Sequence, residues 1–235
     1  MTSPVALVTG ATEGIGRAIA FALGHAGYKV GVCARTPSKL RVLLDALTAA
    51  GIRAAGHPGD VGLEADARNV VAQITSVLGP VDVLVNNAGV AILKPFDQLT
   101  LDEWDTTMAT NLRSLYLVTR EVLPGMRERK RGSIVTISSL AGRNGFVGGS
   151  AYVASKHAAL GFCRALMLEV RKDNIRVIAI CPGSVDTSLI RQQSMLTPNV
   201  DRILQPEDVA ATVLAALSLP ERAMVSELDV RPTNP

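Results

Sequence analysis

The chain has 235 residues, 48% of them hydrophobic and 3% aromatic, and a formal net charge of +3 from 24 basic and 21 acidic residues. This length and hydrophobic content suffice for one large core and argue against disorder. The charges are spread along the chain, without the basic runs or basic–aromatic alternation typical of nucleic-acid-binding surfaces. The composition therefore predicts a globular protein with no nucleic-acid partner.

The N-terminus, the hydropathy and the cysteines indicate a cytoplasmic protein with no membrane segment. An expected strand begins within a few residues of Met1, which leaves no signal peptide, and no hydrophobic run reaches the ~18 residues of a membrane span. Cys33, Cys163 and Cys181 lie in hydrophobic segments without metal-ligand spacing. We therefore expect three reduced, buried thiols and no metal site.

Short hydrophobic runs alternate with helical patterns along the chain. We expect seven strands, over residues 5–9, 28–33, 52–57, 81–85, 133–138, 175–180 and 224–230. Between them we expect helices over 15–25, 38–50, 63–78, 101–129 and 151–172, and a short helix after Glu207. The helix over 101–129 is expected to break near Pro124. Continuous hydrophobic strands between helices are typical of a parallel sheet covered on both faces. No linker divides the chain, so we predict an α/β fold: a single doubly wound Rossmann domain over residues 1–235, with a mostly parallel seven-stranded sheet.

A glycine cluster joins the first expected strand to the first expected helix. In Thr9-Gly-Ala-Thr-Glu-Gly-Ile-Gly16, the three glycines allow a tight turn and the close approach of a pyrophosphate to the helix N-terminus. Ligands of such sheets bind beyond the carboxyl ends of the strands. The strand before the cluster and the helix after it favour a dinucleotide site over a plain tight turn.

The end of the second expected strand indicates which dinucleotide binds. An acidic residue there suits the free ribose 2′-hydroxyl of NAD, whereas an arginine suits the 2′-phosphate of NADP. The chain has Arg35 and no acid at this point, which favours NADP. Glu13 in the glycine loop favours NAD instead, because its carboxylate would repel a nearby phosphate unless it faces solvent.

Tyr152 and Lys156 lie four residues apart on an expected helix, so they project from one face. An unperturbed tyrosine has a pKa near ~10 and is a poor proton donor or acceptor at neutral pH. A nearby lysine ammonium favours the phenolate and lowers that pKa. Ser139, at the end of the fifth expected strand, adds a hydroxyl. The spacing predicts acid–base chemistry, although such a pair also occurs on ordinary helix surfaces.

Together these motifs resemble the short-chain dehydrogenase/reductase family. The resemblance runs from about residue 4 to residue 187 in order and spacing. It rests on the glycine loop, Asp60-Val61, Asn86-Asn-Ala-Gly89, Asn111, Ser139, Tyr152 with Lys156, and Pro182-Gly-Ser-Val-Asp-Thr187. The pattern is most similar to the 3-oxoacyl-carrier-protein reductase-like members, although the C-terminus lacks the Gly-Gly ending common among them.

The resemblance implies a role for each matching residue. It implies a catalytic set of Asn111, Ser139, Tyr152 and Lys156. With the motifs above, it implies a cofactor-binding set of Gly10, Thr12, Gly14, Ile15, Gly16, Arg35, Asp60, Val61, Asn87, Tyr152, Lys156, Pro182, Gly183, Val185 and Thr187. Tyr152 would exchange a proton with the reacting oxygen, Ser139 would orient that oxygen, Lys156 would lower the tyrosine pKa and bind the nicotinamide ribose, and Asn111 would support a proton relay.

The expected function is hydride transfer between NADP(H) and a small or carrier-presented carbonyl or secondary alcohol, in the reductive direction. The alternatives are an NAD-linked alcohol dehydrogenase and a non-catalytic NADP-binding regulator. Residues 188–205 are expected to form a substrate lid, too short and polar for a steroid-sized ligand. Phe146, Val147 and Leu189 are expected to border the pocket, with Lys94 at its mouth. The family's pairing surfaces imply a homodimer or homotetramer.

Overall fold

Seven parallel strands form one sheet in a computed structural model that describes residues 3–193 and 202–234. The strands are β1 (Val5–Thr9), β2 (Lys29–Ala34), β3 (Ala54–Pro58), β4 (Val83–Asn86), β5 (Gly132–Ile137), β6 (Ile175–Pro182) and β7 (Glu227–Val230). Their order is β3-β2-β1-β4-β5-β6-β7, and every pair is parallel. The predicted seven-stranded doubly wound sheet is confirmed, and it is parallel throughout.

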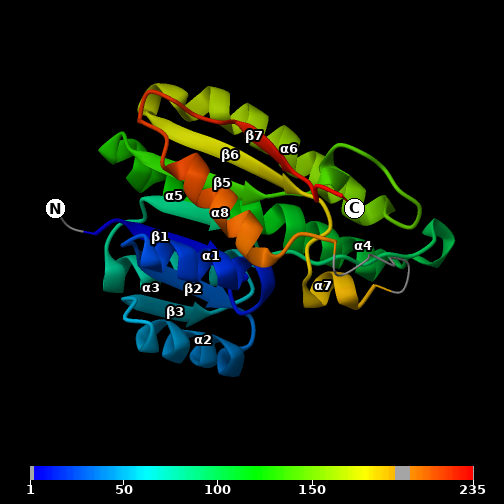
Figure 1. Ribbon diagram of the computed structural model, residues 1–235, viewed down its shortest axis with the longest axis horizontal. Helices are drawn as coiled ribbons and strands as arrows, with labels where there is room; N and C mark the ends of the chain where they lie inside the picture. Colours follow the sequence, from blue (N-terminus) through cyan, green and yellow to red (C-terminus); the bar gives the residue numbers. More distant parts are fainter. Residues whose placement is uncertain (1–2, 194–201, 235) are drawn as a thin grey trace.

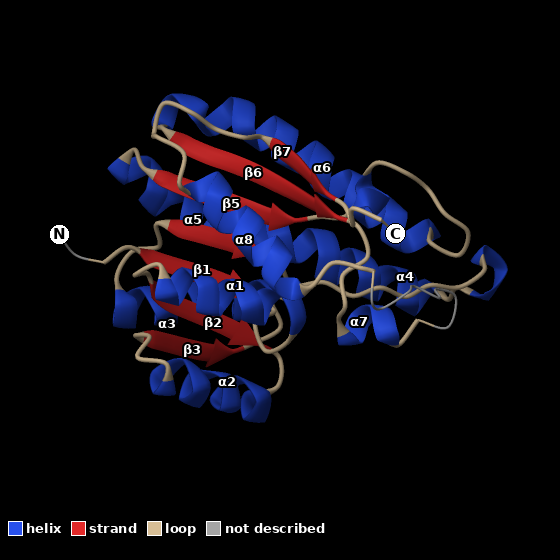
Figure 2. Cartoon of the chain, in the orientation of Figure 1, coloured by secondary structure: helices blue, strands red, loops and turns tan. Residues whose placement is uncertain are grey.

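Eight α-helices accompany the sheet in the described residues and cover both of its faces (Figures 1 and 2). They are α1 (Gly14–His25), α2 (Pro37–Ala49), α3 (Glu64–Leu78), α4 (Leu101–Met108), α5 (Ser114–Arg129), α6 (Ser150–Val170), α7 (Ser188–Arg191) and α8 (Pro206–Leu217). Helices α1, α2 and α8 pack on the face of β1 that carries Ala6 and Val8, and α3, α5 and α6 on the face that carries Val5 and Leu7. Two covered faces explain why the strands are continuously hydrophobic.

The strand order reverses at β1, which lies between β2 and β4. All strands end on the same side of the molecule, where Figure 1 shows α4 and α7 beyond the arrowheads. At this end the loops after β1 and β4 diverge to opposite faces of the sheet. The crevice between such loops is where ligands of open α/β sheets bind.

The long helix expected over residues 101–129 is interrupted, but the predicted break near Pro124 is wrong. Pro124 lies inside α5, which continues to Arg129. The interruption is a π-helical turn, Ala109–Arg113, between α4 and α5. It contains Asn111, whose side chain hydrogen-bonds to backbone and side-chain groups outside the helix. The extra residue of a π-turn is a common feature of functional sites.

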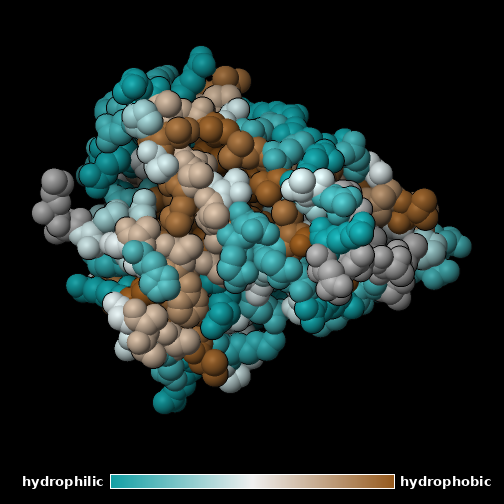
Figure 3. Space-filling model, in the orientation of Figure 1, coloured by the Kyte–Doolittle hydropathy of each residue, from teal (hydrophilic) through white to brown (hydrophobic). Residues whose placement is uncertain are grey.

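The surface shown in Figure 3 groups hydrophobic residues over α8 and along the β6–β7 edge of the sheet. All three cysteines are buried and unpaired, as expected. Within the described residues, no helix has both the length and the hydrophobicity that crossing a membrane requires.

A threonine at the end of β1 joins this strand to the loop after β4. The Thr9 hydroxyl oxygen accepts hydrogen bonds from the backbone N–H groups of Asn87 and Ala88, both at 3.0 Å. The hydroxyl also lies 3.4 Å from the carbonyl oxygen of Val85, to which it donates. Thr9 is 2% exposed, so water cannot replace it as a partner.

Replacing Thr9 by valine keeps the shape of the side chain but removes the acceptor for two N–H groups. Each unsatisfied group costs ~1–3 kcal/mol, so Thr9→Val is expected to lower the free energy of unfolding by about 2–4 kcal/mol in urea titrations. Thr48→Val, at an exposed position on α2, is the matched control and should change stability by less than about 0.5 kcal/mol. Equal stability of the two variants would contradict the role given to Thr9.

Candidate active site

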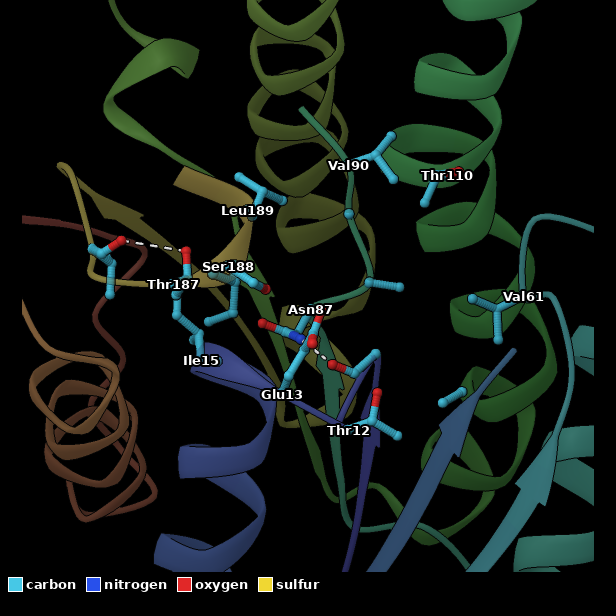
Figure 4. A pocket seen from close by; sticks show the side chains of 18 of the residues that line it. Thr12, Glu13, Ile15, Val61, Asn87, Val90, Thr110, Thr187, Ser188 and Leu189 are labelled. Atoms are coloured by element: carbon cyan, nitrogen blue, oxygen red, sulfur yellow. Dashed lines mark hydrogen bonds between the residues drawn. The ribbon is translucent and has the colours of Figure 1, made fainter. Parts of the chain in front are cut away.

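A pocket opens beyond the carboxyl ends of β1, β2, β4, β5 and β6, at the reversal of strand order. Figure 4 shows side chains of its lining converge from several loops, with Thr12, Glu13 and Ile15 on one side and Val90 and Thr110 on the other. All fifteen residues of the predicted cofactor-binding set line this pocket. Ser139 of the predicted catalytic set also lines it, whereas Asn111 is 4% exposed and lies behind the lining.

The glycine loop has a shape that side chains would prevent. Gly10 and Gly14 have φ angles of +63° and +53°, in the left-handed region that favours glycine. A Cβ atom on Gly16 would lie 2.4 Å from both the Gly10 carbonyl oxygen and Asn87 Nδ2. The Glu13 side chain, at the N-cap of α1, accepts no hydrogen bond from the first N–H groups of the helix. These N–H groups therefore stay free at the pocket end of α1. This donor set fits a pyrophosphate.

Asn87 fixes the glycine loop against the end of β4. Its side-chain nitrogen donates to the carbonyl oxygens of Thr9 and Gly10, both at 3.0 Å. The N–H of Gly10 also donates to the carbonyl oxygen of Cys33 at the end of β2, at 3.1 Å. The loop is therefore held from both neighbouring strands, and Figure 4 shows Asn87 beside Thr12 and Glu13.

Asn111 joins the π-turn to two other parts of the site. Its Oδ1 accepts from the Val90 N–H at 2.8 Å, and its Nδ2 donates to the Val90 carbonyl oxygen at 2.9 Å and to Ser155 Oγ at 3.0 Å. Ser155 in turn donates to the carbonyl oxygen of Tyr152 at 2.7 Å. One buried amide thus sets the position of the loop after β4 relative to the start of α6.

Ser139, Tyr152 and Lys156 meet in the pocket from two elements. Ser139 follows β5 and is held by a 3.0 Å hydrogen bond from the Ala141 N–H to its hydroxyl oxygen. Tyr152 and Lys156 lie one turn apart on α6, and the ammonium is 5.7 Å from the centre of the tyrosine ring. Lys156 is 6% exposed and donates to the Ile137 carbonyl oxygen at 3.0 Å. The spacing along α6 therefore brings Tyr152 and Lys156 together, and the fold adds Ser139 from the end of β5.

Burial moves the pKa values of the tyrosine and the lysine in opposite directions. It lowers the pKa of Lys156 to about 8, because the buried ammonium loses hydration. It raises the pKa of Tyr152, with a hydrogen bond from Ser139 acting against the rise. Loss of hydration thus dominates the tyrosine pKa, and the expected lowering by Lys156 stays a prediction.

At the other end of the pocket, the chain brings together four charged residues. Arg35, which follows β2, is exposed and lines the pocket. Glu13 also lines it and forms an ion pair with Lys39 of α2, with 3.6 Å between Nζ and Oε2. Lys39 was not predicted as a site residue; its only signal in the sequence is its spacing of four from Arg35. Asp60 lines the same end, and its carboxylate accepts from the Gly62 N–H at 2.9 Å.

The expected substrate-side residues are only partly in the pocket. Leu189 of α7 lines it. Of the described residues, Phe146, Val147 and Lys94 lie outside the lining, and the two hydrophobic ones are 39% and 86% exposed. Lys94 forms an ion pair with Glu103 of α4, and its expected place at the pocket mouth stays a prediction. Part of the expected lid, residues 194–201, lies outside the described residues.

Comparison with known proteins identifies the family. Residues 4–195 match the family described as short chain dehydrogenase. The chain belongs to this family. It is therefore an oxidoreductase related to enzymes that act on carbonyl and alcohol groups, as the resemblance of its motifs indicated.

The chain is similar to several named members of the family. It is 45% identical over 189 residues to a putative ketoacyl reductase of Streptomyces coelicolor, covering 80% of this chain and 72% of the relative. It is 37% identical over 220 residues to an acetoacetyl-CoA reductase of Shinella zoogloeoides, covering 90% of each. A crystal structure of an actinorhodin polyketide ketoreductase variant with NADPH superimposes with a TM-score of 0.91 at 37% identity, covering 98% of this chain and 97% of that chain.

The contacts around Gly16 predict that a larger residue at this position impairs dinucleotide binding. A Gly16→Ala side chain would meet a backbone oxygen and the Asn87 amide at 2.4 Å, so the glycine loop must move. We expect nicotinamide dinucleotide binding, measured by fluorescence, to weaken at least about tenfold, with a lower melting temperature. Gly161→Ala on α6 is the control, because a Cβ there meets no atom within 4 Å. This control should bind normally and melt no lower than wild type; unchanged binding by Gly16→Ala would contradict the site.

Proposed function

We propose that this chain is an NADP-dependent reductase of small or carrier-presented carbonyl compounds. The observation that supports this most is the convergence of Ser139, Tyr152 and Lys156 in the pocket that also contains the glycine loop. A proton donor, an orienting hydroxyl and a cation lie at one end, and a phosphate-binding loop lies at the strand ends beside it. This combination suits reduction, in which a carbonyl carbon gains a hydride and its oxygen gains a proton.

In this proposal four residues and the cofactor share the chemistry. NADPH supplies the hydride when it is bound. The Ser139 hydroxyl donates a hydrogen bond that orients the carbonyl oxygen, and the Tyr152 hydroxyl gives that oxygen its proton. The buried Lys156 ammonium binds the nicotinamide ribose and stabilises the phenolate that remains on Tyr152. Asn111 keeps α6 and the loop after β4 in place, and the π-turn gives the lysine a route to solvent protons.

The proposed cofactor contacts follow the length of the pocket. Gly10, Gly14 and Gly16 would surround the pyrophosphate, and Asp60 with Val61 would contact the adenine ring. Residues 182–187, including Thr187, would hold the nicotinamide end. A Cβ on Gly14 would lie 3.0 Å from Thr187 Cγ2, so these two parts of the proposed site are in contact.

Two observations favour NADP and a 3-oxoacyl substrate. Arg35 stands where an acidic residue would suit NAD, and a structural relative carries NADPH in its crystal. Two sequence relatives are named for reduction of ketoacyl and acetoacetyl-CoA compounds. The NAD-linked alcohol dehydrogenase is therefore not favoured, and neither is a non-catalytic regulator, since all four predicted catalytic residues are present. The domain is proposed to extend over residues 1–235, with a lid over 188–205.

The proposed role of Tyr152 as proton donor predicts what happens when its hydroxyl oxygen is removed. Tyr152→Phe removes the proton donor without changing the ring, so kcat for an acetoacetyl thioester should fall by about 10²–10⁴. NADPH should still bind, as measured by its fluorescence. Tyr116→Phe, at an exposed tyrosine on α5, is the matched control and should retain full activity. If Tyr152→Phe turned over substrate at the wild-type rate, the proposed catalytic role would be wrong.

The lysine pKa predicts how reduction depends on pH. Lys156 is protonated below its pKa of about 8, and burial keeps Tyr152 protonated well above that pH. The value of kcat/KM for reduction should therefore be flat at pH 6–7 and fall above about pH 8, towards tenfold per pH unit. Steady-state rates between pH 6 and 10 measure this. A rate that rises through pH 8 would show that the neutral amine is the active form.

We also propose that the chain forms a homodimer or homotetramer in the cytoplasm. Tyr116 on α5 is 48% exposed and Leu168 on α6 is 59% exposed, so both helices present hydrophobic side chains outwards. Light scattering at micromolar concentration is expected to give two or four times the chain mass; a monomer mass would contradict this.

A further inference from the structure

Lys39 stands out among the basic residues near the adenosine end of the pocket. It lies in the first turn of α2, lines the pocket with Arg35 and Glu13, and pairs with Glu13 across 3.6 Å. The two paired side chains are 61% and 59% exposed. Exposed ion pairs of this kind contribute little stability, because water already solvates both charges. Little free energy is therefore lost when another anion takes Lys39 from Glu13.

The position of Lys39 is unfavourable for the helix that carries it. The N-terminus of α2 carries positive partial charge, and its first turn contains no acidic residue. Lys39 adds a second positive charge there, and Arg35 a third just before the helix. Positive charges therefore gather at this end of the pocket, and the carboxylates of Glu13 and Asp60 in its lining partly offset them.

We propose that Lys39 and Arg35 together select the 2′-phosphate of NADP(H), and that Glu13 competes with the phosphate for Lys39. This inference rests on the proposed function, because it concerns the same cofactor. The 2′-phosphate of NADP(H) carries up to two negative charges, so it attracts Lys39 more strongly than one carboxylate does. NAD(H) has a neutral hydroxyl at this point and leaves the Lys39–Glu13 pair intact.

The competition also reconciles the two opposing charges in the sequence. An unpaired Glu13 would repel the phosphate that Arg35 attracts. In the structure the Glu13 carboxylate faces Lys39, which offsets part of its charge before a ligand arrives. Glu13 then lowers the affinity for NADP(H), because it competes with the 2′-phosphate for Lys39.

A double-mutant cycle on the whole protein tests this. Dissociation constants for NADPH and NADH are measured by fluorescence, and those for 2′,5′-ADP and 5′-AMP by calorimetry, for wild type, Lys39→Ala, Glu13→Gln and the double variant. Lys39→Ala should weaken NADPH and 2′,5′-ADP about fivefold, and Glu13→Gln should tighten them about threefold. NADH and 5′-AMP should change less than about twofold, because they lack the phosphate.

The cycle separates competition from simple repulsion. If Glu13 competes for Lys39, Lys39→Ala costs more in the Glu13→Gln protein, about tenfold or more, because the lysine there is free for the phosphate. If Glu13→Gln tightens NADPH equally with and without Lys39, Glu13 acts by repulsion alone and the competition is overturned. Arg41→Ala, at an exposed position on the same helix, is the control for loss of a positive charge and should change binding less than twofold.

Two further outcomes would overturn the inference, and only one of them would also overturn the proposed cofactor. Unchanged NADPH affinity in Lys39→Ala, with a wild type that prefers NADPH, would remove Lys39 from the site and leave the proposed function intact. A wild type that binds NADH as tightly as NADPH would overturn both the inference and the proposed cofactor. Circular dichroism of each variant confirms folding, which these exposed substitutions are expected to preserve.

Discussion

The hydrogen bonds that join the end of β1 to the loop after β4 are the constraint on which the site depends. The Thr9 hydroxyl holds the backbone of Asn87 and Ala88, and the Asn87 amide returns two hydrogen bonds to Thr9 and Gly10. These groups lie where the strand order reverses, so the crevice forms between two loops that are bonded to each other. The glycine loop can therefore keep left-handed backbone angles in a fixed place.

The proposed catalytic end of the pocket, with Ser139, Tyr152 and Lys156, depends on a second buried amide and on burial itself. Asn111 links the π-turn to the loop after β4 and to Ser155, so that α6 meets this loop at a defined position. Burial then favours the neutral forms of both Tyr152 and Lys156. A neutral tyrosine is a proton donor, which suits reduction. A lysine whose pKa is about 8 can give and regain a proton near neutral pH.

The sequence predicted the features that depend on local pattern. The inner strands β1, β4 and β5 are hydrophobic runs, and the glycine loop and the Tyr152–Lys156 spacing are contiguous motifs, so they were found. Features that depend on partners distant in the sequence do not follow from the local pattern. The π-turn contains Asn111, which hydrogen-bonds to Val90 and Ser155, whereas the expected break at Pro124 considered the helix alone. The Lys39–Glu13 pair joins two elements that only the fold brings together, and Lys94 is held by Glu103 of α4.

The most direct test of the account is whether the purified protein oxidises NADPH when a 3-oxoacyl thioester is added, followed by absorbance at 340 nm. Acetoacetyl-CoA is the first substrate, with simple ketones and diketones beside it and NADH as the alternative cofactor. The account predicts tight NADPH binding and its consumption by at least one of these carbonyl classes, faster than with NADH. Binding of NADPH without consumption by any of them, or a clear preference for NADH, would contradict it.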